Sequence, residues 1–276
     1  MYRILKIIGN NFVSATNEKG EIVVLQGLGI GFNQRKGFIV KDSNIERIYR
    51  MENDVEIKKL TELISSIPHE VVSYVATLID DIQQYFENKL RANIYISLTD
   101  HISFAIERFK TDQLYNNAIL NEIKIFYPKE FKLGLAMVDK INNHFKVSLP
   151  IDEAGFIALH IVNAELSINM SETVQMTKII NEIMNTIENF YPNKFDQDSF
   201  NTSRLITHVK YLARGIFTNK LNSIKQEDFE IFLKTKYPFE SKCVLEIRER
   251  LEKIYKKPID DEELLMLAIQ IHKINS

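Results

Sequence analysis

The last third of this chain repeats the amino-acid pattern of its middle third. When residues 127–161 are laid over residues 237–271 at a constant offset of 110, the identical positions include Tyr127/Tyr237, Pro128/Pro238, Lys132/Lys242, Leu135/Leu245, Glu153/Glu263 and Ile161/Ile271. His101, within Leu-Thr-Asp-His-Ile, matches His208, within Leu-Ile-Thr-His-Val, at an offset of 107. A period of this length exceeds that of solenoid repeats, so it indicates a duplicated domain.

The two copies differ in their histidines. His160 of the first copy falls opposite Gln270 of the second, whereas His101 and His208 are shared. His272 does not restore the pair, because two steps along a helix turn a side chain by about 200°. Paired histidines suggest shared chemistry, and the alternative for each of them is a hydrogen-bonded core or interface residue.

The composition is that of a soluble globular protein. Hydrophobic residues make up 45% and charged residues 26% of the 276 positions, which disfavours disorder and allows two or three domains. A single cysteine, Cys243, excludes an internal disulfide and fits a core residue in a reducing compartment. The N-terminal apolar stretch is broken by charge, and no run approaches the ~18 apolar residues of a membrane span. We therefore expect a cytoplasmic protein.

Residues 1–58 have the short apolar runs and turn residues of a small antiparallel β domain. Four strands are expected, starting near residue 4 and over 12–15, 21–25 and 45–51, with a turn at 17–20. So small a core favours dimerisation. Residues 1–51 hold eight Lys or Arg against four Asp or Glu, although the whole chain carries a net charge of −2. This head therefore favours an anionic partner, the alternative being a solvated surface with a chance surplus.

Beyond about residue 58 glycine becomes rare and apolar residues take helical spacing. Helices are expected over 71–86, 99–108, 114–126, 129–145 and 152–166, and again over 174–190, 200–217, 228–235, 239–255 and 261–274. Asp152 is the expected N-cap of the fifth, with Glu153 in its first turn. The polar segment 167–172 is the expected linker. The fold class is thus multidomain, a small antiparallel β head (1–58) followed by two duplicated all-α helical bundles (65–170 and 171–276).

Several segments carry a resemblance to a known family. They are Lys6, Asn10-Asn11, Asn17-Glu-Lys-Gly20, Gly27-Leu-Gly-Ile-Gly-Phe32, Ser97-Leu-Thr-Asp-His101-Ile-Ser-Phe-Ala-Ile and Asp152-Glu-Ala-Gly-Phe-Ile-Ala-Leu-His160-Ile-Val-Asn-Ala. With them the chain resembles, from end to end, bacterial transcriptional antiterminators of the β-glucoside and sucrose utilisation type. The resemblance implies a co-antiterminator RNA-binding head and two regulation domains of the sugar phosphotransferase system (PTS).

The resemblance also implies a function and partners. Such a protein binds a hairpin in nascent mRNA, as a homodimer, and prevents formation of a terminator. Phosphate carried on histidines controls it, here His101, His160 and His208, while Gln270 cannot carry phosphate. A sugar-specific permease (enzyme II) typically inhibits through the first domain, and the phosphocarrier HPr often activates through the second. No cofactor is implied.

The resemblance places RNA contacts in the head, at Lys6, Asn10, Asn11, Gly27, Gly29, Phe32 and Arg35. Unpaired bases are usually read by aromatic stacking, amide side chains and close backbone approach. Each residue has a structural alternative: a core strand position for Phe32, a turn for Asn10 and Asn11, positive φ for Gly27 and Gly29, and solvation for the basic residues. Leu28 departs from several members of the family, which have a basic residue there.

Other classes of function fit less well. The main alternative is a phosphate-responsive interaction protein whose head only dimerises. An enzyme is disfavoured because the sequence has no Gly-rich phosphate loop and no Ser/His/Asp set with a recognisable spacing. His69 and His144 lack partners at metal-ligand spacing and are expected at the surface. Helix-turn-helix DNA binding is disfavoured because the basic end is β.

Overall fold

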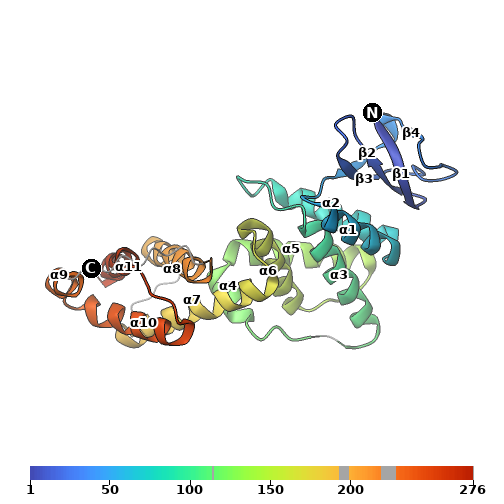
Figure 1. Ribbon diagram of the computed structural model, residues 1–276. Coiled ribbons are helices and arrows are strands. Elements are labelled where there is room, and N and C mark those ends of the chain that lie inside the picture. Colours follow the sequence, from blue (N-terminus) through green and yellow to red (C-terminus); the bar gives the residue numbers. More distant parts are fainter. Residues whose placement is uncertain (114, 193–198, 219–227, 276) are drawn as a thin grey trace. The chain divides into compact units, whose positions relative to one another are not determined.

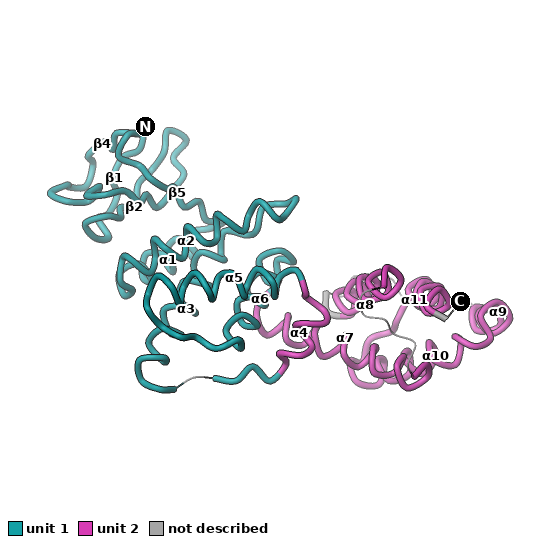
Figure 2. Tube along the Cα trace, turned by 180° about the vertical axis from the view of Figure 1, so that it is seen from behind, with its two compact units in different colours: residues 1–118, 129–168 teal, residues 119–128, 169–276 magenta. Residues whose placement is uncertain are grey.

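The computed structural model describes residues 1–113, 115–192, 199–218 and 228–275 (Figure 1). The chain divides into two compact units (Figure 2). The first comprises residues 1–118 and 129–168, and the second comprises residues 119–128 and 169–276.

The head is a five-stranded antiparallel sheet. Its strands are β1 (Tyr2–Gly9), β2 (Phe12–Thr16), β3 (Ile22–Gln26), β4 (Ile39–Val40) and β5 (Arg47–Tyr49), with a 3₁₀ turn at Asp42–Asn44. Their order across the sheet is β4-β1-β2-β3-β5. The expectation of four strands was wrong because β4, only two residues long, is too short to show a period-2 pattern.

Both faces of this sheet are buried, which explains why consecutive residues of β2 and β3 are buried and why β3 is apolar from Ile22 to Leu25. On one face Val13 and Leu25, paired in the register, form the head's own core with Ile4. On the other face Phe12 and Val24 pack against residues of the following helices, Leu60, Ile64, Val72 and Ala76. The head is therefore half of a two-layer arrangement within the first unit.

The helices of the first unit are α1 (Asp54–Ser66), α2 (His69–Gln83), α3 (Ile94–Lys110), α5 (Pro128–Phe145) and α6 (Ile151–Leu166). Helix α1 was not expected, and it makes residues 54–58 helical rather than β. It begins at Asp54 because the side chain of Asn53 accepts a hydrogen bond from the amide of Glu56 (3.0 Å).

Two local predictions in the first copy were wrong. The helix expected over 114–126 begins only at Leu120; residue 114 lies outside the described residues, and 115–119 are not helical. This segment makes tertiary contacts instead, since the backbone amide of Asn117 donates a hydrogen bond to the Asp152 carboxylate (2.7 Å). Asp152 is therefore not the N-cap of α6, a position that Pro150 takes without a side-chain bond.

The helices of the second unit are α4 (Leu120–Phe126), α7 (Met170–Phe190), α8 (Phe200–Thr218), α9 (Phe229–Lys236), α10 (Glu240–Tyr255) and α11 (Asp261–Asn275). Although α4 precedes α5 in the sequence, it packs against α7. The expected linker 167–172 is shorter than predicted. A capping box between Asn169 and Glu172 starts α7 at Met170, so residues 170–172 are helical.

The duplication extends to the connections between helices. In the turn between α5 and α6 the side chain of Asn142 accepts the amide of Leu149 (2.8 Å). At the same place in the second copy Glu252 accepts the amide of Ile259 (3.0 Å). Donor and acceptor of the second bond each lie 110 positions after those of the first. The offset read from the sequence is therefore a repeat of tertiary structure.

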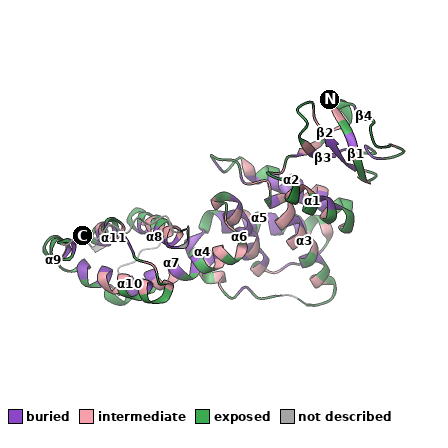
Figure 3. Ribbon diagram, viewed as in Figure 1, coloured by how far each residue is buried: buried purple, intermediate pink, exposed green. Residues whose placement is uncertain are grey.

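The helices are amphipathic and bury one side. Figure 3 shows buried positions along the inner sides of the helices and exposed positions on their outer sides. Cys243 in α10 is fully buried, as predicted for a core residue. None of the helices in the described ranges is long and apolar enough to span a membrane.

A polar network joins the head to α2 and α3 within the first unit. Asp80 of α2 binds the Arg47 guanidinium of β5 (2.6 and 3.0 Å) and accepts a short hydrogen bond from the Tyr95 hydroxyl of α3. The side-chain amide of Gln26 donates a hydrogen bond to the Ser73 hydroxyl of α2 (2.8 Å). These bonds fix β3 and β5 to the helices beneath them.

We predict that Asp80→Asn loosens this junction. Removing the carboxylate charge should lower the free energy of unfolding of the first unit by about 1 kcal/mol, since the pair is partly exposed. Hydrogen exchange of the β5 amides should accelerate as well. The matched control is Asp81→Asn, which removes the neighbouring carboxylate and its exposed bond to Lys140 (2.8 Å). Equal effects of the two substitutions in denaturation and hydrogen exchange would contradict the prediction.

Candidate functional site

A buried carboxylate joins two of the predicted residues in the first helical copy. The side chain of Glu153, in the first turn of α6, is 1% exposed. One of its oxygens contacts Nε2 of His101 (2.7 Å), and the other accepts a hydrogen bond from Nη2 of Arg108 (3.1 Å). Seven residues separate His101 from Arg108 on α3, so the predicted shared face is confirmed.

The electrostatics of this cluster favour an ionised Glu153. Burial raises the pKa of its carboxyl, but the hydrogen bonds and positive charges of His101 and Arg108 outweigh burial and hold the pKa below its usual range. The guanidinium of Arg108 also lies over the ring of Tyr115, 4.7 Å from its centroid. The segment before α4 thus helps to hold the arginine.

His160 lies beside His101 in a different environment. The two ring centroids are 5.0 Å apart, with a tilt of 43°. His160 is buried in α6, and its Nδ1 makes no hydrogen bond with any described residue. Burial, and then the positive charge of His101, lower its pKa to about 3. His160 is therefore a neutral imidazole packed in the core.

The second copy lacks this arrangement. Nε2 of His208 bonds to the backbone carbonyl of Glu263 (3.2 Å), and the Glu263 carboxylate lies farther away (3.7 Å) and partly exposed. Gln270 is buried, whereas the side chain of His272 is 55% exposed and contacts Glu240. As predicted, His272 does not face the same way as Gln270.

In the head, two of the predicted RNA contacts hold the glycine-rich segment in place. The Asn11 side-chain oxygen accepts the amide of Gly29 (2.8 Å), and its backbone carbonyl accepts the amide of Gly27 (3.1 Å). The backbone carbonyl of Asn10 likewise accepts the amide of Gly31 (2.9 Å). Gly27 has a packing role, because a Cβ there would lie 1.9 Å from the carbonyl oxygen of Asn44.

The remaining predicted RNA contacts lie at the surface. Phe32 is 59% exposed and follows this segment, so it is not a core strand residue. Lys6 of β1 and Arg35 are exposed as well. Leu28 is exposed at the tip of the same segment. The head thus combines an exposed aromatic ring, exposed basic side chains and a loop held by hydrogen bonds.

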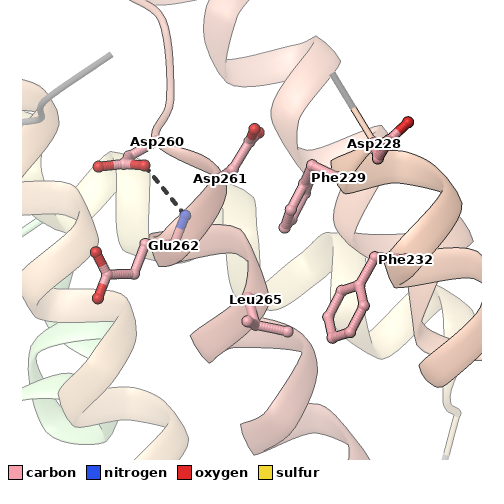
Figure 4. Close-up of a pocket in the computed structure, with 7 residues that line it drawn as sticks. All are labelled: Asp228, Phe229, Phe232, Asp260, Asp261, Glu262 and Leu265. Carbon is pink, nitrogen blue, oxygen red and sulfur yellow. Dashed lines mark hydrogen bonds between the residues drawn. The ribbon is translucent and has the colours of Figure 1, made fainter. Parts of the chain in front are cut away.

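A pocket of about 410 Å³ in the second unit contains none of the predicted residues. Figure 4 shows its lining at the starts of α9 and α11: Asp228, Phe229, Phe232, Asp260, Asp261, Glu262 and Leu265. Four carboxyl-bearing residues line it, and Asp261 is paired with Arg248. Acidic walls of this kind disfavour phosphate or RNA.

The sequence marks Glu153 as a repeated position and a first-turn residue, but it does not place this residue beside His101. The repeat was the available signal, since Glu153 and Glu263 coincide and both contact the shared histidine of their copy. His69 and His144 are exposed, as expected. His144 stacks on Tyr74 with ring centroids 3.7 Å apart.

Comparison with known proteins shows the family. The CAT RNA binding domain matches residues 2–58, and the PRD domain matches residues 76–164 and again 181–274. The chain is 36% identical to the transcription antiterminator LicT of Bacillus subtilis (strain 168), over 99% of this chain and 98% of LicT. It is 34% identical to the β-glucoside operon antiterminator of Dickeya chrysanthemi, over 99% of this chain and 97% of that protein.

A solved structure agrees with these matches. The crystal structure of GlcT CAT-PRDI superposes with a TM-score of 0.53 at 32% identity, and the match covers 59% of this chain and 97% of that one. The chain therefore belongs to the family of transcription antiterminators that combine a CAT RNA-binding domain with PRD domains. The alternative of a head that only dimerises is not favoured by these matches.

We predict that Phe32→Ala weakens binding of a hairpin from the protein's own leader RNA. Loss of one stacked base should cost about 1–3 kcal/mol of binding free energy. The exposed ring should contribute little to folding, so the unfolding midpoint should stay unchanged. Gel-shift titration measures the affinity, and Phe38→Ala, which removes another exposed phenylalanine of the head, is the control. Wild-type affinity of the Phe32 variant would refute the stacking role.

Proposed function

We propose that this chain binds a hairpin in nascent mRNA, prevents formation of a terminator hairpin, and is switched by PTS-dependent phosphorylation of its PRD domains. The observation that carries the proposal is the combination, in one chain, of a matched CAT RNA-binding domain and two matched PRD domains. LicT and the β-glucoside operon antiterminator are transcription antiterminators, and their matches to this chain cover nearly their whole length. They are regulators, and the chain is proposed to act as one rather than as an enzyme.

The geometry of the head supports RNA recognition at one surface. Lys6, Asn10, Asn11, Gly27, Gly29, Phe32 and Arg35 are its proposed contacts. Because Asn11 Oδ1 is bonded to the amide of Gly29, its NH₂ group is the part available to a base edge. The exposed ring of Phe32 suits stacking on an unpaired base, and the basic side chains suit phosphates.

The geometry of the helical domains supports control by phosphate. We propose His101, His160 and His208 as the regulatory histidines, and 65–170 and 171–276 as the two regulation domains behind the head of 1–58. Phosphorylation turns a neutral or singly charged ring into an anion. Beside the buried carboxylate of Glu153 such a charge changes the packing of α3 on α6.

The partners follow from the same proposal. A sugar-specific PTS permease is the proposed donor for the first domain and HPr for the second. The protein acts in the cytoplasm, where nascent transcripts are made, and as a homodimer. A symmetric dimer doubles the RNA-binding surface that one small head offers.

We predict tight and salt-dependent binding of the leader hairpin. Several Lys and Arg contacts to phosphates release counterions, so affinity should fall by at least tenfold between about 50 and 200 mM salt. Gel-shift titration at the two salt concentrations checks this, with a hairpin of equal length and scrambled loops as control. Equal affinity for both RNAs would contradict sequence-specific recognition.

We predict that HPr labels the second domain at His208 only. Gln270 has no nucleophilic nitrogen, and His272 lies on another face. Phosphorylation with purified HPr, its upstream kinase and phosphoenolpyruvate, followed by peptide mass spectrometry, locates the phosphate. The variant Gln270→His should gain label at position 270. Label on His272 of the wild-type protein would show that the missing site has been replaced.

A further inference from the structure

We propose that Glu153 and Arg108 are positioning residues that direct phosphate to Nδ1 of His101, so that His101 accepts phosphate ahead of its neighbour His160. This inference rests on the proposed function, because it concerns the chemistry of phosphate control in the first PRD domain. It assigns different roles to His101 and His160, which the sequence alone does not distinguish.

The contact with Glu153 determines the tautomer of His101. An ionised carboxylate has only acceptor atoms, so the 2.7 Å contact with Glu153 requires a proton on Nε2 of His101. When His101 is neutral, its lone pair must therefore be on Nδ1. Nδ1 makes no hydrogen bond with any described residue, and the side chain is 16% exposed. The nucleophilic nitrogen is thus the free one.

Arg108 holds the Glu153 carboxylate in place. It binds the other oxygen of Glu153, so the carboxylate cannot turn away from the histidine ring. Its own Nε is buried and bonded to no described residue. Arg108 therefore keeps Glu153 ionised and in place.

The phosphoryl transfer balances with these groups. The Nδ1 lone pair forms the new N–P bond while the bond between phosphorus and the donor's nitrogen or sulfur breaks, and that electron pair stays with the donor. Nε2 keeps its proton, so the ring gains one positive charge. The negative charge of Glu153, 2.7 Å from Nε2, compensates it. No further reactant is needed.

His160 is less accessible to a phosphate donor than His101. His160 is a buried residue of α6, and its Nδ1 is a buried atom. A donor protein must bring its phosphorus atom within bonding distance of the nitrogen, which requires the site to open first. His160 instead packs against the ring of His101 at 5.0 Å.

The second copy offers an internal control. There the backbone carbonyl of Glu263 bonds to Nε2 of His208 at 3.2 Å, while the carboxylate oxygen is 3.7 Å away. A backbone carbonyl fixes the same tautomer and is present whatever the side chain. Glu263→Gln should therefore leave His208 unaffected, whereas Glu153→Gln should alter His101.

The test uses the full chain and potassium phosphoramidate, a small N–P donor that needs neither RNA nor a partner protein. Peptide mass spectrometry gives the labelling rate of each histidine, and ³¹P and ¹⁵N NMR of ¹⁵N-histidine protein identifies the phosphorylated nitrogen. We expect wild-type His101 to be labelled on Nδ1, ahead of His160. Glu153→Gln should slow this labelling about tenfold, because a charge-assisted hydrogen bond is lost. It should also yield phosphate on both nitrogens, because the Gln amide can face Nε2 with its NH₂ group.

Three outcomes would overturn the proposal: wild-type phosphate on Nε2 of His101, His160 labelled as fast as His101, or equal effects of Glu153→Gln and Glu263→Gln on their respective histidines. If Glu153→Gln fails to fold, the nitrogen identified in the wild-type protein still decides. A protein that binds no RNA but labels as expected would refute the proposed function and leave this inference standing.

Discussion

The first regulation domain depends on one buried carboxylate. A charge with 1% exposure is costly unless it is paired and hydrogen-bonded, so Glu153 requires both His101 and Arg108. Because those two lie on α3 and Glu153 on α6, the pairing also fixes how the two helices pack. A change of charge on His101 therefore cannot stay local: it alters the balance that keeps Glu153 buried, and with it the contact between α3 and α6.

Helix α3 connects this cluster to the RNA-binding head. Near its start Tyr95 donates to Asp80, which also holds Arg47 of β5. Burial raises the pKa of Tyr49 to about 12, so its hydroxyl stays protonated and donates to Gln26 (2.7 Å). The same helix thus carries the histidine at its middle and a bond toward the sheet at its start. The head is held to the regulation domain by polar groups with defined partners, in addition to apolar packing.

The duplication preserves the scaffold more closely than the chemistry. The residues after α5 and α10, Lys146 and Lys256, have the same left-handed φ of 55° and 54°. Yet the Glu153 carboxylate is buried and bonded to both His101 and Arg108, whereas the Glu263 side chain is 33% exposed and its backbone carbonyl bonds to His208. Packing demands repeat because each bundle must bury the same apolar faces. A buried ion pair repeats only when every partner is kept, and no arginine stands where Arg108 would recur.

The sequence by itself determined the class of fold and the repeat, because helical spacing of apolar residues and a constant offset are properties of the chain alone. It also placed His101 and Arg108 on one face, because seven residues are two turns of helix. Only the tertiary structure decided that Glu153, 52 residues from His101, closes the cluster. It also decided that the Asp152 carboxylate accepts a hydrogen bond from the backbone amide of Asn117 instead of capping α6. Such partners depend on which helices pack together, and local propensity does not encode that. The sequence could likewise not show that the His160 side chain is more buried than that of His101, because burial arises from the whole fold.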